Sequence, residues 1–462
     1  MIKKLNRLTL WGFILCSTAL HAQNNWDKAT EIANQLNPVT SFADKTYLIT
    51  DFGAKGDGIA PSKEAFDKAI TTCSENGGGT IVVKAGNYYM NGPLVLKSNV
   101  HIKLEAGAVL NFSTDENDYL PAVLTRWEGT EVYNFSPLIY AYHVNNIAIT
   151  GQRTINGHGS KYFAKWKKEQ NPDKKILREM GKKNVPVYKR IFGKGHKLRP
   201  GFFEPFGCTN VRLEGITILD SPFWVIHPIF CNNVIIRKVT VKSNNPNNDG
   251  ADPESCTNVL IEDCNFEIGD DAIAIKSGRD NDAWRVGQPS EHIVIRNCLF
   301  SSKINGVCIG SEIAGGVRNV FIENIDIPKS SNALYFKSNL DRGGYIENIF
   351  VRNISTGTVV SSLIRFEPNY KGERSAFHPT RFKNFNIENV TCKVSEQTGL
   401  YLAGFKGLPI EDITLKNIKI DKAEAPYSLK NGKNIVFDNV SINGIVLDKK
   451  PKEVDLIKLN TH

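Results

Sequence analysis

One short phrase recurs along the second half of the chain and restricts the fold more than any other feature. The phrase is Asn-Val-x-Ile-x-x-Ile, and successive copies lie roughly 22 to 36 residues apart, the spacing of a solenoid. Clear copies begin at Asn210, Asn233, Asn258, Asn319, Asn348 and Asn434, and weaker copies at His292, Asn384 and Asp412. Within each copy the apolar residues alternate, which is the period of a β-strand.

Six positions after each anchor stands a small or medium hydrophobe. These are Ile216, Val239, Cys264, Cys298, Ile325, Ile354, Val390, Ile418 and Val440. Each copy is too short for a strand-helix-strand crossover, and no helical pattern separates the copies. The strands must therefore return by turns and stack in parallel on the next copy, so the pattern predicts an all-β parallel β-helix.

The cysteines follow the same repeat. Cys208, Cys231 and Cys256 each stand two residues before an anchor, and Cys264 and Cys298 occupy the inward hydrophobic position. We interpret them as core thiols, with a disulfide or a metal site as the alternative.

The open ends of a solenoid need covers. Trp26, Ala29, Ala33 and Leu36 recur at helical spacing. Ser62 is placed to cap a second helix, which carries apolar residues and stops at the glycines of 77–79. The residues of its apolar face are Ala65, Phe66, Ala69, Ile70 and Cys73. We expect both short helices to close the amino-terminal end.

The first residues read as a targeting segment. Lys3, Lys4 and Arg7 precede an apolar run that is too short to span a bilayer, and no other stretch is long enough to do so. We therefore predict a signal peptide over residues 1–22 and an exported protein, periplasmic or secreted, without membrane insertion. With 41% hydrophobic and 23% charged residues, the remainder is folded rather than disordered.

Basic residues gather in one segment of the predicted single domain, residues 23–462. The insert at 161–199 holds 14 Lys or Arg against three acidic residues, a net charge of +11 that exceeds the +9 of the whole chain. It is either a solvated loop between coils or a basic wall over a groove that attracts an anionic polymer.

Carboxylates concentrate in the central coils. Asp249 and Asp270 are 21 residues apart, close to the shortest coil, so they are expected side by side on adjacent coils. Asp271 can also reach solvent if the chain bends after Gly269. Clustered carboxylates repel, so one holds its proton while another ionises, as glycoside hydrolysis requires. The alternatives are turn-satisfying side chains and a calcium site.

Four longer motifs stand in this region. They are Ser221-Pro222-Phe223-Trp224-Val225-Ile226-His227-Pro228, Asn247-Asn248-Asp249-Gly250-Ala251-Asp252, Gly269-Asp270-Asp271-Ala272-Ile273-Ala274-Ile275-Lys276-Ser277-Gly278-Arg279 and Ile309-Gly310-Ser311-Glu312. Together they resemble glycoside hydrolase family 28, the polygalacturonases and their relatives. The opening Asp51-Phe52-Gly53-Ala54-Lys55-Gly56-Asp57-Gly58 is similar to the start of β-helix domains of the same superfamily.

The resemblance implies a right-handed β-helix and an inverting hydrolase. Asp270 would be the general acid, and Asp249 and Asp271 the bases, with carboxyls roughly 6.5 to 9.5 Å apart to admit water. It implies no metal and no cofactor. The expected partner is an anionic, pectin-like polysaccharide or oligosaccharide rather than nucleic acid, and the expected state is a monomer.

Two departures from the family's pattern concern substrate contacts. Asn305, or Ile304, stands where the family usually has a histidine, and Tyr335-Phe336-Lys337 replaces Arg-Ile-Lys. The candidate substrate-binding residues are His227, Asn248, Asp252, Arg279, Asn305, Tyr335, Lys337 and Arg342, with Arg285 as a further cation. His227 is expected to face the cleft or to be a satisfied buried histidine, and Tyr335 to stack on a sugar.

The departures leave other functions open. A lyase or dehydratase acting on uronates is one alternative, and a non-catalytic glycan-binding β-helix is another. The retained carboxylates argue against simple binding, which does not need them.

Overall fold

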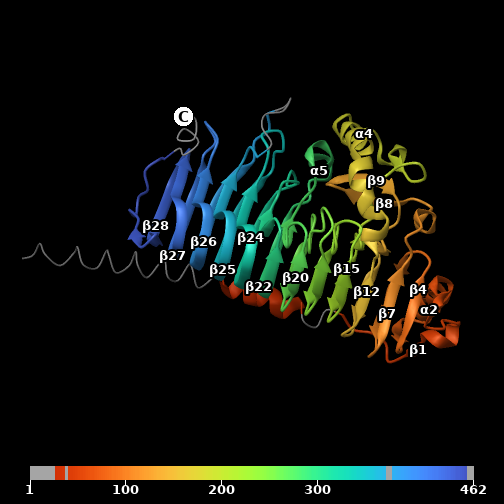
Figure 1. Ribbon diagram of the computed structural model, residues 1–462. Coiled ribbons are helices and arrows are strands. Elements are labelled where there is room, and N and C mark those ends of the chain that lie inside the picture. The colour runs from red at the N-terminus through yellow and green to blue at the C-terminus, as the bar shows by residue number, and fades with distance from the viewer. Residues whose placement is uncertain (1–25, 37–39, 371–376, 455–462) are drawn as a thin grey trace, which may run out of the picture.

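The chain winds into one long solenoid in the computed structural model, which describes residues 26–36, 40–370 and 377–454 (Figure 1). The predicted signal peptide lies outside the described residues. The strands, nearly all paired in parallel, are β1 (Thr46–Leu48), β2 (Asp57–Pro61), β3 (Gly79–Val83), β4 (Gly86–Met90), β5 (Leu94–Leu96), β6 (Val100–Leu104), β7 (Ala108–Phe112), β8 (Val123–Trp127), β9 (Thr130–Asn134), β10 (Ile139–Tyr142), β11 (Asn145–Thr150), β12 (Thr154–Asn156), β13 (Ile191–Phe192), β14 (Phe203–Phe206), β15 (Thr209–Glu214), β16 (Thr217–Leu219), β17 (Asn232–Arg237), β18 (Thr240–Ser243), β19 (Thr257–Glu262), β20 (Asn265–Ile268), β21 (Ile273–Ile275), β22 (Ser290–Ser302), β23 (Asn305–Ile309), β24 (Val317–Lys337), β25 (Tyr345–Glu367), β26 (Arg381–Ala403), β27 (Ile410–Lys430), β28 (Gly432–Ile442) and β29 (Ile445–Val446).

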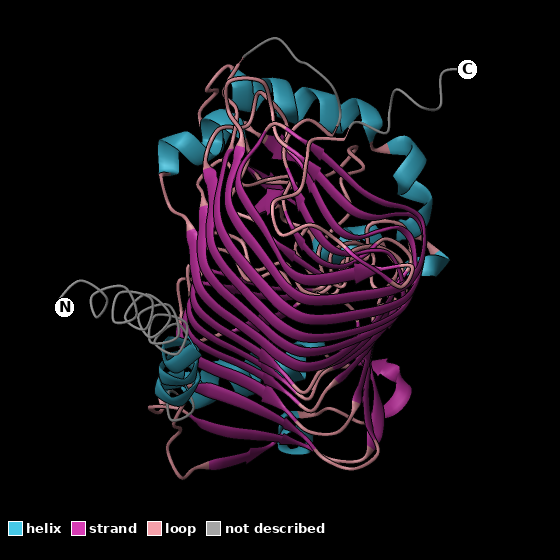
Figure 2. Cartoon of the chain, turned by 90° about the vertical axis from the view of Figure 1, so that its left-hand side faces the viewer, coloured by secondary structure: helices cyan, strands magenta, loops and turns pink. Residues whose placement is uncertain are grey.

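Helices are short and lie outside the solenoid wall (Figure 2). Besides residues 26–36 they are α2 (Lys63–Glu75), α3 (Trp166–Glu169), α4 (Asn171–Lys182) and α5 (Asp280–Val286), with 3-10 turns η1 (Ile49–Phe52), η2 (Glu116–Tyr119), η3 (Gly159–Lys161), η4 (Phe163–Lys165) and η5 (Val187–Lys189). None of these described helices is long and apolar enough to cross a membrane. The predicted fold class, a right-handed parallel β-helix, is confirmed.

The repeat phrase sets the register between coils. The hydrophobes that follow the anchors pair one above another and fill the interior as a continuous column. That column is Val211, Val234, Val259, Ile293, Val320, Ile349, Phe385, Ile413 and Ile435. The predicted core thiols are also confirmed, because the eight cysteines from Cys73 to Cys392 are buried and free.

The anchor residues themselves form the bend that starts each strand. All nine have φ between +55° and +61°, the left-handed region that asparagine tolerates better than most residues. Their amides also stack: Asn233 donates to Asn210 at 3.0 Å and Asn348 to Asn319 at 3.1 Å. The asparagine of the phrase is therefore selected by backbone conformation and by its neighbour on the adjacent coil.

Helix α2 covers the first coils, as predicted, with its apolar face in the main core. It begins directly after Ser62, but the Ser62 hydroxyl makes no capping bond to the helix.

The prediction that a helix at residues 26–36 closes the amino-terminal end was wrong about its position. This helix lies along the flank of the central coils, below β22 and β25 in Figure 1, rather than at the amino-terminal end. Its Ala29, Ile32, Ala33 and Leu36 pack on side chains from five strands that lie side by side on successive coils, β17, β19, β22, β24 and β25. Those side chains are Ile235, Leu260, Val294, Phe321 and Phe350.

Candidate functional site

The three predicted catalytic aspartates follow two neighbouring strands at the same side of the solenoid. Asp249 comes after β18 and Asp270 after β20. The amide of Asp270 donates to the carbonyl of Asn248 at 3.3 Å, and that of Gly250 to the carbonyl of Asp271 at 2.9 Å. These bonds place the two carboxylate-bearing segments on adjacent coils.

The register differs by one residue from the expected one. Ala251 pairs with Ile273, a spacing of 22, so Asp249 stands opposite Asp271 rather than Asp270. Asp270 still reaches the same site because the chain bends at residues 269–270.

All three aspartates line one cavity of about 270 Å³. Its wall is mostly charged: the carboxylates are Glu128, Asp249, Asp270, Asp271 and Glu312, and the cations are Lys167, Lys174, Arg178, Lys276, Arg279 and Lys337. Trp224, Asn247, Gly310, Ser311 and Tyr370 complete the lining. Such a wall suits a charged, hydroxyl-rich ligand rather than an apolar one.

Asp270 has the properties of a proton donor. Burial, and then the nearby carboxylate of Asp271, raise its pKa to about 6. The amide of Asn247 donates to its Oδ2 at 3.3 Å. The pKa of Asp249 is also raised, first by burial and then by Asp252 and Asp270.

Asp271 accepts hydrogen bonds on both oxygens. The Asn305 amide donates to Oδ1 at 2.5 Å and the Lys337 ammonium to Oδ2 at 3.1 Å. Asn305 in turn accepts from the Asn332 amide at 2.8 Å on the next coil. Two donors on two oxygens suit a carboxylate that serves as an acceptor.

Lys276 is a buried cation that joins the carboxylates of two coils. Its Nζ lies 3.4 Å from Asp249, 3.2 Å from Asp252 and 4.0 Å from Glu312. It also lies 4.4 Å from the centre of the Trp224 ring. The clustered negative charge raises the pKa of Lys276 despite its burial, so the lysine stays charged.

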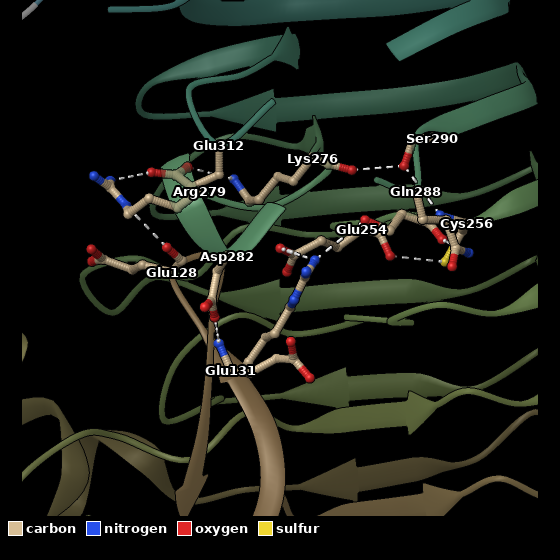
Figure 3. Close-up of polar contacts among 12 residues, drawn as sticks. Glu128, Glu131, Glu254, Cys256, Lys276, Arg279, Asp282, Gln288, Ser290 and Glu312 are labelled. Atoms are coloured by element: carbon tan, nitrogen blue, oxygen red, sulfur yellow. Dashed lines mark hydrogen bonds and ion pairs between the residues drawn. The ribbon is translucent and has the colours of Figure 1, made fainter. Parts of the chain in front are cut away.

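Arg279 extends this chain of charges toward the β8–β9 hairpin (Figure 3). Its guanidinium contacts Glu312 at 2.6 Å and donates through Nε to the Glu128 carbonyl at 3.2 Å. Burial opposes ionisation of Glu312, but Arg279 and Lys276 outweigh it and hold the pKa of Glu312 well below its usual value. Arg279 is thus at the predicted site, although its charge is already paired.

The basic insert forms part of the cavity wall. Lys167, Lys174 and Arg178 come from α3 and α4 and line the cavity. The insert residue Leu177 packs in one buried apolar cluster with Phe223 and Trp224 of the β-helix and with Trp127 of the β8–β9 hairpin. Of the two interpretations of the insert, the structure favours the wall.

His227 does not face the cavity, and its expected orientation toward the cleft was wrong. The ring is buried between Glu204, at 3.2 Å, and Glu254, at 2.8 Å. Burial alone would lower the pKa of His227, but these two hydrogen bonds raise it to about 9. The alternative, a satisfied buried histidine, describes it correctly.

Two more predicted contact residues lie behind the wall. Asn248 is buried and holds the turn before Asp249, donating to the carbonyl of Phe223 at 2.8 Å. Asp252 is fully buried beside Lys276. Neither is among the cavity-lining residues.

The remaining predicted contacts are also occupied elsewhere. The Tyr335 hydroxyl donates to Glu367 at 2.5 Å, and Asn305 contacts the site only through Asp271. Arg342 is buried against Asp280 at 2.7 Å, while Arg285 pairs with Glu131 at the surface. Only Lys337 and Arg279 of the predicted contact residues line the cavity.

Several lining residues were missed. Trp224, Lys276 and Glu312 stand within the motifs quoted from the sequence, and that position could have identified them as candidate site residues. Glu128 and Tyr370 belong to no motif, and only the folded chain brings them to the cavity. Among the described residues, no group of three or more His, Cys, Asp or Glu side chains is arranged to hold a metal ion.

Comparison with known proteins gives consistent matches. A family model described as Glycosyl hydrolases family 28 matches residues 73–436. A hyperthermoactive exopolygalacturonase structure from Thermotoga maritima superposes with a TM-score of 0.86 at 37% identity, covering 91% of this chain and 97% of that one. A probable polygalacturonase of Vitis vinifera is 29% identical over 81% of this chain and 74% of its own length. An exo-poly-alpha-D-galacturonosidase of Dickeya chrysanthemi is 25% identical over 92% of this chain and 75% of its own length.

Proposed function

The chain belongs to glycosyl hydrolases family 28, and from that premise we propose that it hydrolyses galacturonan by attack at the chain end. The observation that carries the proposal is the meeting of Asp249, Asp270 and Asp271 in one cavity lined by cations. Cations complement the carboxylate of each galacturonate residue, and carboxylates supply the acid and base of glycoside hydrolysis.

In the proposed reaction Asp270 protonates the leaving glycosidic oxygen. Its pKa of about 6 lets it keep a proton at mildly acidic pH. Asp271 and Asp249 then act as bases that orient and deprotonate a water on the opposite face of the sugar, so that the anomeric configuration inverts. Asp249 has to be ionised for this task, and Lys276 at 3.4 Å stabilises that form.

Attack at the chain end is supported by the position of the insert. Helices α3 and α4, with the β8–β9 hairpin, rise over the amino-terminal side of the central coils (Figure 1). Three of the insert's cations line the cavity, so the insert forms one of its walls. A wall on that side would stop a longer chain from passing through. The similar exopolygalacturonase of Thermotoga maritima agrees with this mode of attack.

Polygalacturonate digestion tests the reaction type. If the reaction is hydrolysis, new reducing ends should appear without the ultraviolet absorbance of an unsaturated uronate. If attack is at the chain end, short products should be released from the first minutes. A rise in that absorbance would show that the reaction is elimination and not hydrolysis. A large fall in viscosity after only a few cleavages would show that the enzyme attacks inside the chain and not at its end.

The acid is tested with Asp270→Asn. Because the amide cannot donate an acidic proton, kcat should fall about 10²- to 10⁴-fold. Asp263→Asn is the matched control, since Asp263 is exposed on the same coil and is not among the lining residues. Near-normal turnover by a folded Asp270→Asn variant would contradict the assignment.

We also propose export, with residues 1–22 removed as a signal peptide. The basic start and short apolar run support this proposal. Mass spectrometry of the native protein should find a mature amino terminus near residue 23.

A further inference from the structure

The tip of the β8–β9 hairpin places a carboxylate in the cavity wall. Glu128 and Gly129 form the two-residue turn between the paired residues Trp127 and Thr130. Both have positive φ, +44° and +83°, as a type I′ turn requires. Glutamate is an unfavourable residue for this conformation, so its presence at the tip is not explained by the turn.

Arg279 holds the backbone of the turn through two hydrogen bonds. The amide of Arg279 donates to the Gly129 carbonyl at 2.9 Å, and its Nε to the Glu128 carbonyl at 3.2 Å (Figure 3). A Cβ on Gly129 would approach Arg279 and Glu312 to 2.9 Å, so only glycine fits this contact. The Glu128 side chain therefore starts from a fixed point.

The carboxylate of Glu128 is held by two cations of the insert. Lys174 contacts Oε1 at 2.8 Å and Arg178 contacts Oε2 at 2.6 Å. Burial would raise the pKa of Glu128, but Lys174, Arg178 and Arg279 lower it to about 2. Glu128 is consequently a fixed acceptor, and each of its oxygens keeps a further lone pair.

A fixed carboxylate can distinguish the end of a sugar chain from its interior. The non-reducing terminal residue carries a free hydroxyl at the linkage position, which donates a hydrogen bond. The same oxygen of an internal residue is glycosidic and has no proton. A substrate that displaces water from the acceptor without offering a donor leaves the acceptor unpaired. The lost hydrogen bonds to water weaken the binding of that substrate.

We propose that Glu128 is a specificity-determining residue that accepts the hydrogen bond of this terminal hydroxyl. Lys174 and Arg178 fix its orientation. Both side chains line the same cavity, so their positive charge also attracts the carboxylate of the terminal galacturonate. This inference rests on the proposed chain-end hydrolysis and adds the group that recognises the end.

The test compares two substrates on the full chain. One is trigalacturonate, and the other is its analogue with hydrogen in place of the free linkage hydroxyl on the non-reducing terminal residue. The wild type should hydrolyse the analogue with kcat/KM at least about 10²-fold lower, because the acceptor is left unpaired. Equal kcat/KM values for the two substrates would overturn the role of Glu128 and leave the proposed hydrolysis intact.

Measuring a Glu128 variant on both substrates completes a double-mutant cycle, in which one change is in the enzyme and the other is the missing hydroxyl of the substrate. Glu128→Gln should lower kcat/KM for trigalacturonate about 10- to 100-fold and bring the ratio between the substrates to within about tenfold. Glu131→Gln, on the same hairpin and outside the cavity lining, should keep the wild-type ratio.

The other outcomes are equally decisive. A folded Glu128→Gln that loses rate on both substrates but keeps their ratio would show that Glu128 only ties the insert to the hairpin. If the wild type hydrolyses neither trigalacturonate nor polygalacturonate, the proposed function fails and this inference fails with it.

Discussion

Most of the charged side chains around the cavity contact a charge of opposite sign, even where they are fully buried. Lys276 alone contacts Asp249, Asp252 and Glu312. Removing one member of such a group leaves the others uncompensated in a medium of low polarity, which typically costs several kcal/mol. Each substitution at the cavity will therefore act on the neighbours of the replaced residue as well as on the residue itself.

Lys337 offers a test of this coupling through the pH profile. Its positive charge lowers the pKa of Asp270, which burial and Asp271 raise to about 6. The acid must be protonated to act, so kcat/KM should fall as pH rises through about 6. Lys337→Gln removes the opposing cation, and the alkaline limb should move to higher pH while the maximal rate falls.

Lys303→Gln is the control for this experiment. Lys303 is exposed two residues before Asn305, and it carries the same charge without lining the cavity. An alkaline limb that stays in place in Lys337→Gln, or moves to lower pH, would contradict the coupling.

The sequence predicted the carboxylates of the site but not all of their surroundings. Asp249, Asp270 and Asp271 could be placed together because a coil-length spacing brings residues to adjacent coils. The direction of His227 depends on Glu204, one coil earlier and in no motif, so the sequence alone could not decide it. Glu128 could not be found because a hairpin outside the repeat carries it.

At the scale of elements, the helix at residues 26–36 seals an apolar column on the outside of the solenoid. Trp26 contributes to the seal, with its ring 6.0 Å from that of Phe321 and the Arg352 guanidinium 3.9 Å above it. Uncovered, the five outward side chains would expose a continuous apolar stripe to water.

Truncating the buried face of this helix should release it locally. Ile32→Ala removes a side chain that is 2% exposed, which typically costs about 2–5 kcal/mol. Amide hydrogen exchange within residues 26–36 should accelerate about thirty-fold or more, because local opening is enough for exchange. Coils of a solenoid contact only their neighbours, so turnover should change little.

Asn34→Ala is the matched control, since Asn34 is exposed on the same helix. Unchanged exchange in Ile32→Ala, or equal acceleration in Asn34→Ala, would refute the docking of the apolar face.

The existence of this helix was predictable and its place was not. Apolar residues at helical spacing specify a one-sided helix, but not what it packs on. A signal for the partner was present: Val234-Ile235-Ile236 and Val259-Leu260-Ile261 read as three apolar residues in a row rather than alternating. A strand of that kind is buried on both faces.

At the scale of the whole molecule, the positive charge is concentrated over the site. The insert carries a net +11 while the chain as a whole carries +9, so the rest is slightly acidic. A polyanion should be drawn toward the insert end of the cavity from a distance, by a field that salt screens within about 10 Å at 0.1 M.

Steering predicts a strong salt dependence on long substrates. Between about 0.01 and 0.5 M sodium chloride, kcat/KM on polygalacturonate should fall about tenfold or more. Replacing exposed insert lysines by glutamine should flatten this dependence without changing the products. The chosen residues are Lys165, Lys168, Lys175 and Lys182.

Exposed lysines of the carboxyl-terminal coils serve as the control set and should leave the salt dependence unchanged. They are Lys393, Lys406, Lys416 and Lys422. Rates that do not respond to salt, or that respond equally in both variants, would count against steering by the insert.

The position of the helix at residues 26–36 has a consequence for biosynthesis. This helix is made before every other described element of the fold, yet the surface on which it packs extends to Phe350, more than three hundred residues further along the chain. A ribosome must therefore deliver most of the coils before the earliest segment can dock. The growing solenoid remains unsealed along one side during that interval, and the leading helix is the last part of the wall to close.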